Sequence, residues 1–280
     1  MTGSLYVVAT PIGNLEDITP RAVRVLGEAD MIAAEDTRYS RGLLTHFQIK
    51  TPMFSCHKFN EGKRGDFFIS ALKQGKNVAL ISDAGTPCIS DPGHRLVKLA
   101  AMEGFDVIPV CGASAAIAAL SVSGFDVTRF SFVGFLPRSK GEIIKMLGGV
   151  LPGVAVFYES PRRIAATLAS IYENFPTAQV CLCNDISKKF ERVYHGGIEQ
   201  VLREIEGNPD AEKGEYTCVF QVMELPASDE DTHEAISIEA QLVDMMVKHG
   251  GTLKDAAGRL QKLYKKKEIY AAMLRLKELL

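Results

Sequence analysis

The segment Ala33-Ala34-Glu35-Asp36-Thr37-Arg38 places two carboxylates, a hydroxyl and a guanidinium directly after an apolar run. Carboxylates can accept a proton, and an arginine guanidinium holds anionic groups such as phosphate in a fork. The segment is therefore a candidate for binding a hydroxylated substrate or for general-base catalysis. The structural alternative is that Asp36 or Thr37 caps the helix that follows.

Three further segments are rich in glycine, proline and small polar residues. Residues 9–15 contain a Pro-x-Gly-Asn turn, residues 82–93 form an unusually long loop, and residues 110–116 hold Gly112 among small side chains. Loops of this kind expose backbone N–H groups and let a nucleotide-like ligand approach the main chain. The alternatives are plain strand-to-helix turns, close helix packing and, for Asp83, a loop cap.

Several common site motifs are absent from the sequence. Neither G-x-G-x-x-G nor G-x-x-x-x-G-K-[ST] occurs, which argues against a dinucleotide fingerprint and a P-loop. The G-x-S-x-G nucleophile turn is also missing. The six cysteines include no C-x-x-C pair and no histidine at zinc-ligand spacing, so we expect no metal site.

Short apolar runs separated by segments of helical period must position these loops. Nearly continuous runs are typical of strands buried on both faces, and they predict a parallel α/β sheet up to about residue 120. The runs are Leu5–Ala9, Met31–Ala34, Val78–Ile81 and Val107–Val110. Thr19-Pro20 is a helix start, and Gly104 ends a helix that begins near Gly93. Ligands of such sheets bind at the carboxyl ends of the strands, where the polar loops lie.

A second α/β region is predicted from about residue 121 to 225, with a partly antiparallel sheet. Its strand candidates are Val154–Tyr158, Val180–Cys183, Glu191–His195 and Tyr216–Val222. Helices are expected near 140–148, 161–174 and 197–206, the second of them opened by a Ser160-Pro161 cap.

Charge divides the rest of the chain into unlike parts. The total of 32 Lys and Arg against 34 Asp and Glu gives a net charge of −2, which argues against a protein that coats nucleic acid duplexes. Residues 224–247 carry seven acids and no Lys or Arg, whereas residues 248–280 carry nine bases and three acids. We predict that residues 226–280 form an acidic linker, which includes Pro226–Thr232, and a basic helical subdomain, with Thr252 capping one helix and Lys265–Lys267 marking the turn before another. Leu253, Ala257, Leu260 and Tyr264 are its expected buried face.

The composition, 46% hydrophobic and 24% charged, is that of an ordinary globular chain. No apolar stretch approaches the about 18 residues of a membrane span, and the N-terminus lacks a basic region followed by an apolar one. We expect a cytoplasmic protein without a membrane partner.

Seven motifs in order resemble one family. The chain is similar to the tetrapyrrole-methylase-like (class III) S-adenosylmethionine-dependent methyltransferases, in particular to members that modify ribosomal RNA. The matching segments are Leu5–Asp17, Ala33–Arg38, Leu80–Gly93, Gly134–Pro137, Phe157–Arg163, Lys188–Glu191 and Gly214–Glu215. One departure concerns the usual Pro-Gly-Pro-Ser-Ala turn, which here is Cys111-Gly112-Ala113-Ser114-Ala115.

The resemblance implies two α/β domains, 1–120 and 121–225, with S-adenosylmethionine held in the cleft between them. It also implies a homodimer that methylates the ribose 2′-hydroxyl of a cytidine in the decoding centre of 16S rRNA, as free RNA or within the small ribosomal subunit. An enzyme that methylates a tetrapyrrole or corrin precursor has the same fold and cofactor. A third hypothesis is a binding module whose C-terminal helices form a helix-turn-helix.

Candidate roles follow for individual residues. We expect the substrate face to include the general base, with Glu35, Asp36, His57 and Glu159 as candidates. The cofactor is expected to contact Pro11, Ile12, Gly13, Asp83, Gly85, Thr86, Ile89, Gly112 and Ser114. Substrate binding is expected from Arg38, Asn60, Arg162 and Lys188. Basic pairs beside these motifs are candidates for an RNA backbone path.

Overall fold

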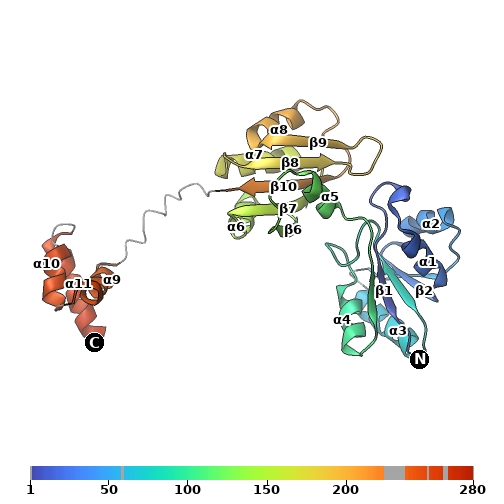
Figure 1. The fold of residues 1–280 in the computed structure, drawn as a ribbon, viewed down its shortest axis with the longest axis horizontal. Coiled ribbons are helices and arrows are strands. Elements are labelled where there is room, and N and C mark those ends of the chain that lie inside the picture. Colours follow the sequence, from blue (N-terminus) through green and yellow to red (C-terminus); the bar gives the residue numbers. More distant parts are fainter. Residues whose placement is uncertain (1, 58–59, 224–236, 251, 261–263, 280) are drawn as a thin grey trace. The chain divides into compact units, whose positions relative to one another are not determined.

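The computed structural model describes residues 2–57, 60–223, 237–250, 252–260 and 264–279. The chain divides into two compact units, Met1–Glu224 and Leu225–Leu280. Within the described ranges, the first unit contains two five-stranded sheets and the second contains three helices (Figure 1). The predicted linker over Pro226–Thr232 lies outside the described residues.

The first sheet is parallel throughout, with the strand order β3-β2-β4-β1-β5. Its strands are β1 (Leu5–Val8), β2 (Met31–Ala34), β3 (Met53–Ser55), β4 (Val78–Ile81) and β5 (Val107–Val110). All four predicted runs are strands, and every residue of β2 and β4 is buried, as their continuous apolar sequence indicates. The edge strand β3 was not predicted.

Helices cover both faces of this sheet. Helices α1 (Pro20–Glu28) and α2 (Thr37–His46) pack on one face, and α3 (Glu61–Lys73) and α4 (His94–Met102) pack on the other. The predicted caps are confirmed: Thr19 Oγ1 accepts from the Ala22 N–H at 3.1 Å, and Gly104 follows the end of α4 at a φ of +77°. The short helix η1 (Leu15–Asp17) lies between β1 and α1.

The second sheet is mixed, as predicted, with the order β6-β7-β10-β8-β9. Its strands are β6 (Ser131–Phe135), β7 (Gly153–Glu159), β8 (Gln179–Asn184), β9 (Arg192–Gly197) and β10 (Tyr216–Val222). β6 pairs parallel with β7, and the remaining pairs are antiparallel. β6 was not predicted as a strand.

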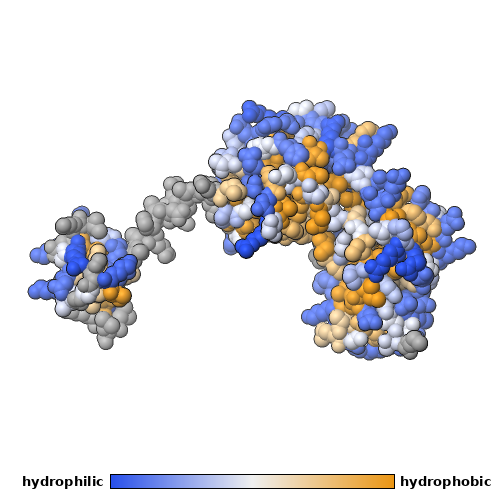
Figure 2. Space-filling view, in the orientation of Figure 1, coloured by the Kyte–Doolittle hydropathy of each residue, from blue (hydrophilic) through white to orange (hydrophobic). Residues whose placement is uncertain are grey.

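The two faces of the second sheet are covered unequally. Helices α6 (Lys140–Gly148), α7 (Ile164–Asn174) and α8 (Ile198–Glu206) pack on one face. On the other face, α5 (Ala115–Val122) packs on β7, β8 and β10. Figure 2 shows hydrophobic residues at the surface over these strands and beside α5. The strand residues under α5 are buried, whereas Ile117 and Val122 on α5 are 56% and 49% exposed.

One predicted helix start is wrong. α7 begins at Ile164 rather than at Pro161, and no side chain caps it. The Ser160 carbonyl accepts from the Arg163 and Ile164 N–H groups, so residues 161–163 form a turn before the helix. The i to i+3 bond from the Arg163 N–H closes a tight turn over residues 160–163, and the regular helix begins after it, at Ile164.

The second unit is a helical bundle of α9 (Ile238–His249), α10 (Leu253–Leu260) and α11 (Lys266–Leu279). The predicted buried face is confirmed, since Leu253, Ala257, Leu260 and Tyr264 belong to its core. Thr252 and Asp255 cap α10 reciprocally, with N–H to side-chain oxygen distances of 2.8 and 3.3 Å. The lysine run does not form a separate turn, because α11 already begins at Lys266.

Candidate functional site

The loops that follow β1, β4 and β5 are joined by hydrogen bonds at the carboxyl end of the first sheet. The backbones of Thr10 and Gly85 exchange two N–H to O=C bonds, of 2.9 and 3.1 Å. Gly85 has a φ of +77°, which glycine adopts without strain. The Thr86 hydroxyl donates to the Ala113 carbonyl at 3.2 Å. Three of the predicted ligand-binding loops therefore form one structure.

Two of the predicted cofactor-binding glycines are required by contacts within the protein. A Cβ at Gly112 would lie 2.8 Å from the Ala9 Cβ, and a Cβ at Gly13 would lie 2.4 Å from the Lys188 Cγ. Such distances are too short for two carbon atoms that are not bonded to each other. The close packing that the sequence left as an alternative explains both glycines without a ligand.

A cavity of about 430 Å³ lies against these loops and against the second sheet. Its volume and its mixture of apolar and polar walls are those of a small-molecule site. Eight predicted site residues line it: Ile12, Glu35, Asp83, Gly85, Thr86, Ile89, Ser114 and Glu159. Residues of β7 and β10 and their flanking loops also line it, among them Tyr158, Pro161, Glu215 and Thr217.

A second cavity, of about 200 Å³, borders the first one. Pro11 and Gly13, two predicted cofactor-binding residues, line this smaller cavity and not the larger one. Asp83 lines both. Neighbouring residues of the segment after β1 therefore line different cavities, which could not be predicted from their spacing in the sequence.

Five carboxylates line the larger cavity; Glu159 and Glu215 are paired with Arg163 and Lys188, which leaves the cluster of Glu35, Asp83 and Asp91. Burial is the largest cause that raises the pKa of each, and neighbouring negative charges raise it further. For half-buried Asp91 the pKa is raised to about 6. Such a cluster favours a cationic ligand, because a positive charge in the cavity would relieve the repulsion.

Asp91 was not assigned a role from the sequence. It lies ten residues beyond the end of β4, and the Ser-Asp-Pro-Gly stretch around it is indistinguishable from an ordinary turn. The length of the loop was the available indication, because most strand-to-helix connections need only a few residues.

The variant Asp91→Asn should make the free protein more stable at neutral pH. The folded protein binds a proton at Asp91 more tightly than the unfolded chain does, so ionised Asp91 destabilises the fold above pH 6. A pKa rise from 3.8 to about 6 corresponds in full to about 3 kcal/mol, and solvent screening reduces this to about 1 kcal/mol for a half-buried group. Thermal unfolding should show the gain at pH 7.5 and its loss by about pH 4. An equal gain at both pH values would contradict this assignment.

Asp36 caps α2, which confirms the structural alternative for this residue. Its Oδ1 accepts from the Arg38 N–H at 2.8 Å, and its Oδ2 pairs with the Arg38 guanidinium at 2.7 Å. The hydrogen bonds from Arg38 hold the pKa of Asp36 well below its usual range. A carboxylate of this kind is a weak base, and neither residue lines either cavity.

Both carboxylate oxygens of Glu159 are bonded to neighbouring residues. Its Oε1 accepts from the Ser160 N–H at 2.7 Å, and its Oε2 accepts from the Thr167 hydroxyl at 2.8 Å. Oε2 also pairs with the Arg163 guanidinium at 3.2 Å, and Arg163 in turn donates to the Leu136 and Pro137 carbonyls. Two motifs of the family resemblance, at Gly134–Pro137 and Phe157–Arg163, are thereby linked.

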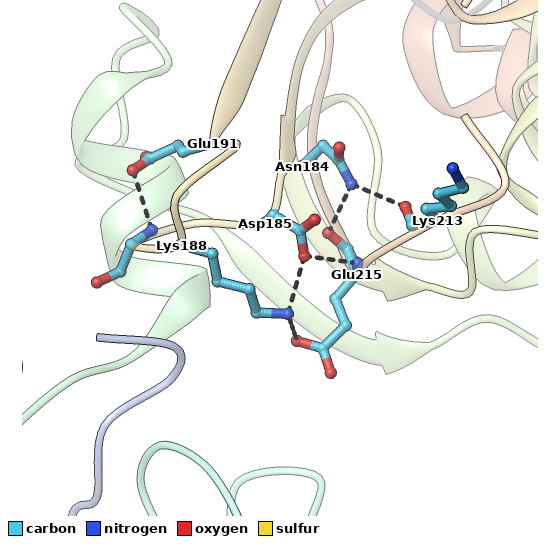
Figure 3. Close-up of polar contacts among 7 residues, drawn as sticks. Asn184, Asp185, Lys188, Glu191, Lys213 and Glu215 are labelled. Carbon is cyan, nitrogen blue, oxygen red and sulfur yellow. Dashed lines mark hydrogen bonds and ion pairs between the residues drawn. The ribbon is translucent and has the colours of Figure 1, made fainter. Parts of the chain in front are cut away.

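The ammonium group of Lys188, a predicted substrate contact, forms ion pairs with two carboxylates (Figure 3). Its Nζ lies 2.8 Å from Asp185 Oδ1 and 2.9 Å from Glu215 Oε2, and Asp185 Oδ1 also accepts from the Glu215 N–H at 3.3 Å. Beside it, the Ser187 hydroxyl donates to Asp17 Oδ2. The loop after β8 therefore contacts the segment after β1 through Gly13, Asp17 and Lys188.

The other predicted residues lie outside both cavities. Asn60 Oδ1 accepts from the His57 N–H at 2.8 Å, so Asn60 shapes the loop after β3. His57 is near enough to Glu35 to lower its pKa slightly. Arg162 is exposed at the turn before α7. The predicted roles of these residues stay predictions.

The part of the chain that the structure describes lacks two features. No three His, Cys, Asp or Glu side chains there are grouped so that they could hold a metal ion. No described helix is both long enough and apolar enough to span a membrane.

Comparison with known proteins gives consistent matches. A family model described as tetrapyrrole (corrin/porphyrin) methylases matches residues 4–202. Two relatives are named ribosomal RNA small subunit methyltransferase I. The Pseudomonas aeruginosa protein is 42% identical over 249 residues, which are 88% of this chain and 87% of the relative. The Bacillus subtilis protein is 38% identical over 275 residues, 96% of this chain and 94% of the relative.

Solved structures agree on the fold. Diphthine synthase matches with a TM-score of 0.60 at 15% identity, covering 80% of this chain and 92% of that one. Uroporphyrin-III C-methyltransferase from Thermus thermophilus, complexed with S-adenyl homocysteine, matches with a TM-score of 0.54 at 17% identity. It covers 79% of this chain and 98% of that structure. At such identities the likeness concerns the fold alone.

Proposed function

Because the chain belongs to the tetrapyrrole (corrin/porphyrin) methylase family, we propose that it transfers a methyl group from S-adenosylmethionine to 16S rRNA. The acceptor that we propose is the ribose 2′-hydroxyl of cytidine 1402, in standard numbering, in the decoding centre. The observation that carries the proposal is the relation to ribosomal RNA small subunit methyltransferase I, at 38–46% identity over most of the chain.

The larger cavity fits S-adenosylmethionine. Its volume of about 430 Å³ lies within the range of roughly 300–1,000 Å³ of small-molecule sites. Ile12, Ile89 and Pro161 form apolar walls of the cavity. Ser114, which also lines the cavity, precedes the first residue of α5, and its hydroxyl makes no capping hydrogen bond to that helix. Glu35, Asp83 and Asp91 suit a ligand that carries a positive sulfonium and an ammonium group. When bound, the cofactor supplies an electrophilic methyl group.

The protein's own part is to orient the hydroxyl and to take its proton. A ribose hydroxyl is a poor nucleophile at neutral pH, and a positioned base with a pKa near the working pH helps most. Of the four predicted candidates, Asp36 is paired with Arg38, Glu159 is held by Arg163, and His57 lies outside the cavities. We therefore assign proton acceptance to Glu35, whose pKa is raised by burial and by Asp83.

The C-terminal unit is the proposed second contact with RNA. Lys254 and Arg259 on α10, Lys265 before α11, and Lys266 and Lys267 on α11 are exposed to solvent. Exposed cations on a separately folded unit would bind phosphates with a salt-dependent affinity. Methylation of a tetrapyrrole or corrin precursor, the alternative, is supported by the fold alone and gives this unit no role.

The test is to incubate the protein with labelled S-adenosylmethionine and small ribosomal subunits that lack the modification. Digestion to nucleosides should recover the label in 2′-O-methylcytidine, from assembled subunits or from free 16S rRNA tested in parallel. A tetrapyrrole precursor serves as the competing substrate. Label found only on the macrocycle, or on a base rather than on the ribose, would refute the proposal.

A homodimer, implied by the resemblance, is the proposed assembly. Exposed apolar side chains support it: Ile117 and Val122 on α5 and Phe130 in the segment that follows are between 43% and 56% exposed. Large apolar side chains exposed close together in the sequence are typical of a surface that another protein covers. Sedimentation equilibrium of the wild type should give twice the mass of one chain. The Ile117→Glu variant should give the mass of a single chain. A wild-type protein that sediments as a monomer at micromolar concentration would contradict this proposal.

A further inference from the structure

Three basic pairs follow strands of the second sheet, and the structure divides each pair in the same way. One member of each pair is bound to carboxylates: Lys140 to Glu173, Arg163 to Glu159, and Lys188 to Asp185 and Glu215. The other members, Arg138, Arg162 and Lys189, are exposed, and none of them forms an ion pair with a carboxylate in the described part of the chain. Lys189 Nζ lies 5.4 Å from the centre of the Phe190 ring, a contact that leaves its positive charge uncompensated.

The strand directions bring these three exposed cations to one edge of the second sheet. β10 pairs antiparallel with β7 and with β8, and β6 pairs parallel with β7, so β6, β7 and β8 all run in the same direction. Each cation lies three to five residues beyond the end of one of these strands. Across the order β6-β7-β10-β8 they span three strand spacings, about 14 Å. We call Arg138, Arg162 and Lys189 the basic row.

The basic row lies beside the larger cavity. Phe135, Pro161 and Ile186 line that cavity, and each is within three residues of a member of the row. The cavity itself is lined by carboxylates, which would repel a phosphate placed inside it. The row can therefore hold the phosphates of a polyanion at the edge of the cavity, while a neutral part of the polyanion, such as a ribose, enters it.

We propose that the basic row binds backbone phosphates of ribosomal RNA on either side of the target cytidine. Arginine binds phosphate oxygens in a fork, and a stacked strand advances about 3.4 Å per phosphate, so about 14 Å covers roughly four phosphates. Such contacts fix the position of a nucleotide without reading its base. Lys188, a predicted substrate contact, is assigned to the protein's own structure, and Lys189 binds the RNA in its place. The inference rests on the proposed function and names the residues that present the acceptor ribose to the cavity.

The experiment compares two triple variants of the full chain that lose the same charge. The row variant combines Arg138→Gln, Arg162→Gln and Lys189→Gln. The control variant combines Arg24→Gln, Lys140→Gln and Arg203→Gln, which removes three exposed cations that are paired with carboxylates and line neither cavity. The row variant should raise the KM for unmodified small subunits about tenfold or more, while kcat and the affinity for S-adenosylhomocysteine stay within about twofold of the wild type. The control variant should match the wild type in all three measurements.

The dependence of RNA affinity on salt concentration counts the lost phosphate contacts. Each contact with a single strand contributes a slope of about −0.7 to log affinity against log salt concentration, so three lost contacts should flatten the slope by about 2. Between about 50 and about 200 mM salt, binding of 16S rRNA should therefore weaken about 20-fold less in the row variant than in the wild type. Fluorescence anisotropy of labelled RNA measures both slopes.

A row variant with the RNA affinity and the salt slope of the control variant would overturn the inference, and methylation of ribosomal RNA by the wild type would leave the proposed function standing. Weaker binding of S-adenosylhomocysteine at unchanged RNA affinity would assign the row to the cofactor's carboxylate and would also overturn the inference. So would an effect with small subunits while free 16S rRNA binds both variants equally, because the row would then contact a ribosomal protein. The three single variants, each flattening the slope by about 0.7, keep the test valid if thermal unfolding shows that the row variant does not fold. A wild-type protein inactive on ribosomal RNA would overturn both proposals.

Discussion

Replacing Glu35 with glutamine should lower kcat for methyl transfer at least a hundredfold, while S-adenosylhomocysteine still binds. Glutamine keeps the shape of the side chain but accepts no proton, and general-base catalysis typically contributes about 10²- to 10⁴-fold. Glu35 lines the larger cavity and has its pKa raised by burial and by the charge of Asp83. A raised pKa makes its carboxylate a stronger base near neutral pH than an ordinary glutamate.

The matched control is Asp36→Asn, a change at the adjacent carboxylate. Asp36 caps α2 and pairs with Arg38 outside the cavities, so we expect a change in kcat of less than about threefold, with at most about 1 kcal/mol lost in stability. Single-turnover assays at saturating RNA separate chemistry from binding. Wild-type kcat in a folded Glu35→Gln protein would remove Glu35 from the mechanism.

The dependence of the rate on pH gives a second test of Glu35, through its neighbour Asp83. The rate should rise with pH until Glu35 is ionised and then level off. Asp83→Asn removes the negative charge that raises the pKa of Glu35, so the rising limb should move to lower pH. A limb that does not move would show that another group controls the rate.

Local sequence patterns predicted most of the fold because they report on burial along one strand or one helix. The continuous runs of β2 and β4 are buried on both faces, and the Thr19-Pro20 start of α1 is a local hydrogen bond. β3 escaped prediction because it has three residues, directly follows a proline and lies at the edge of the sheet. β6, interrupted by a register shift near Gly134, gave no regular alternation.

The candidate site was only half predictable, because its decisive contacts join residues far apart in the chain. The loops after β1, β4 and β5 could be found, since topology brings strand ends together. That Gly13 is required by Lys188 depends on a contact across 175 positions.

Glu159 shows how the same motif can be essential for structure rather than for chemistry. Its side chain is 1% exposed, and it joins the end of β7 to Thr167 on α7 and to Arg163, which holds the carbonyls at Leu136 and Pro137. Each carboxylate oxygen already accepts at least one hydrogen bond. Oε2 holds two partners and Oε1 one, so the carboxylate is tied to the protein at both oxygens and we assign it a structural role.

Glu159→Ala should therefore destabilise the protein by about 3–5 kcal/mol, because removing one partner leaves a partly buried guanidinium without its counter-charge. Urea unfolding of the full chain measures this directly. The control Glu173→Ala, on α7, breaks an exposed 3.7 Å pair with Lys140 and should cost less than about 0.5 kcal/mol. If Glu159→Ala instead unfolds like the wild type and loses methyl transfer, the residue acts on the substrate and the structural assignment is wrong. If the folded fraction of Glu159→Ala keeps the activity of the wild type, Glu159 has a structural role and does not act on the substrate.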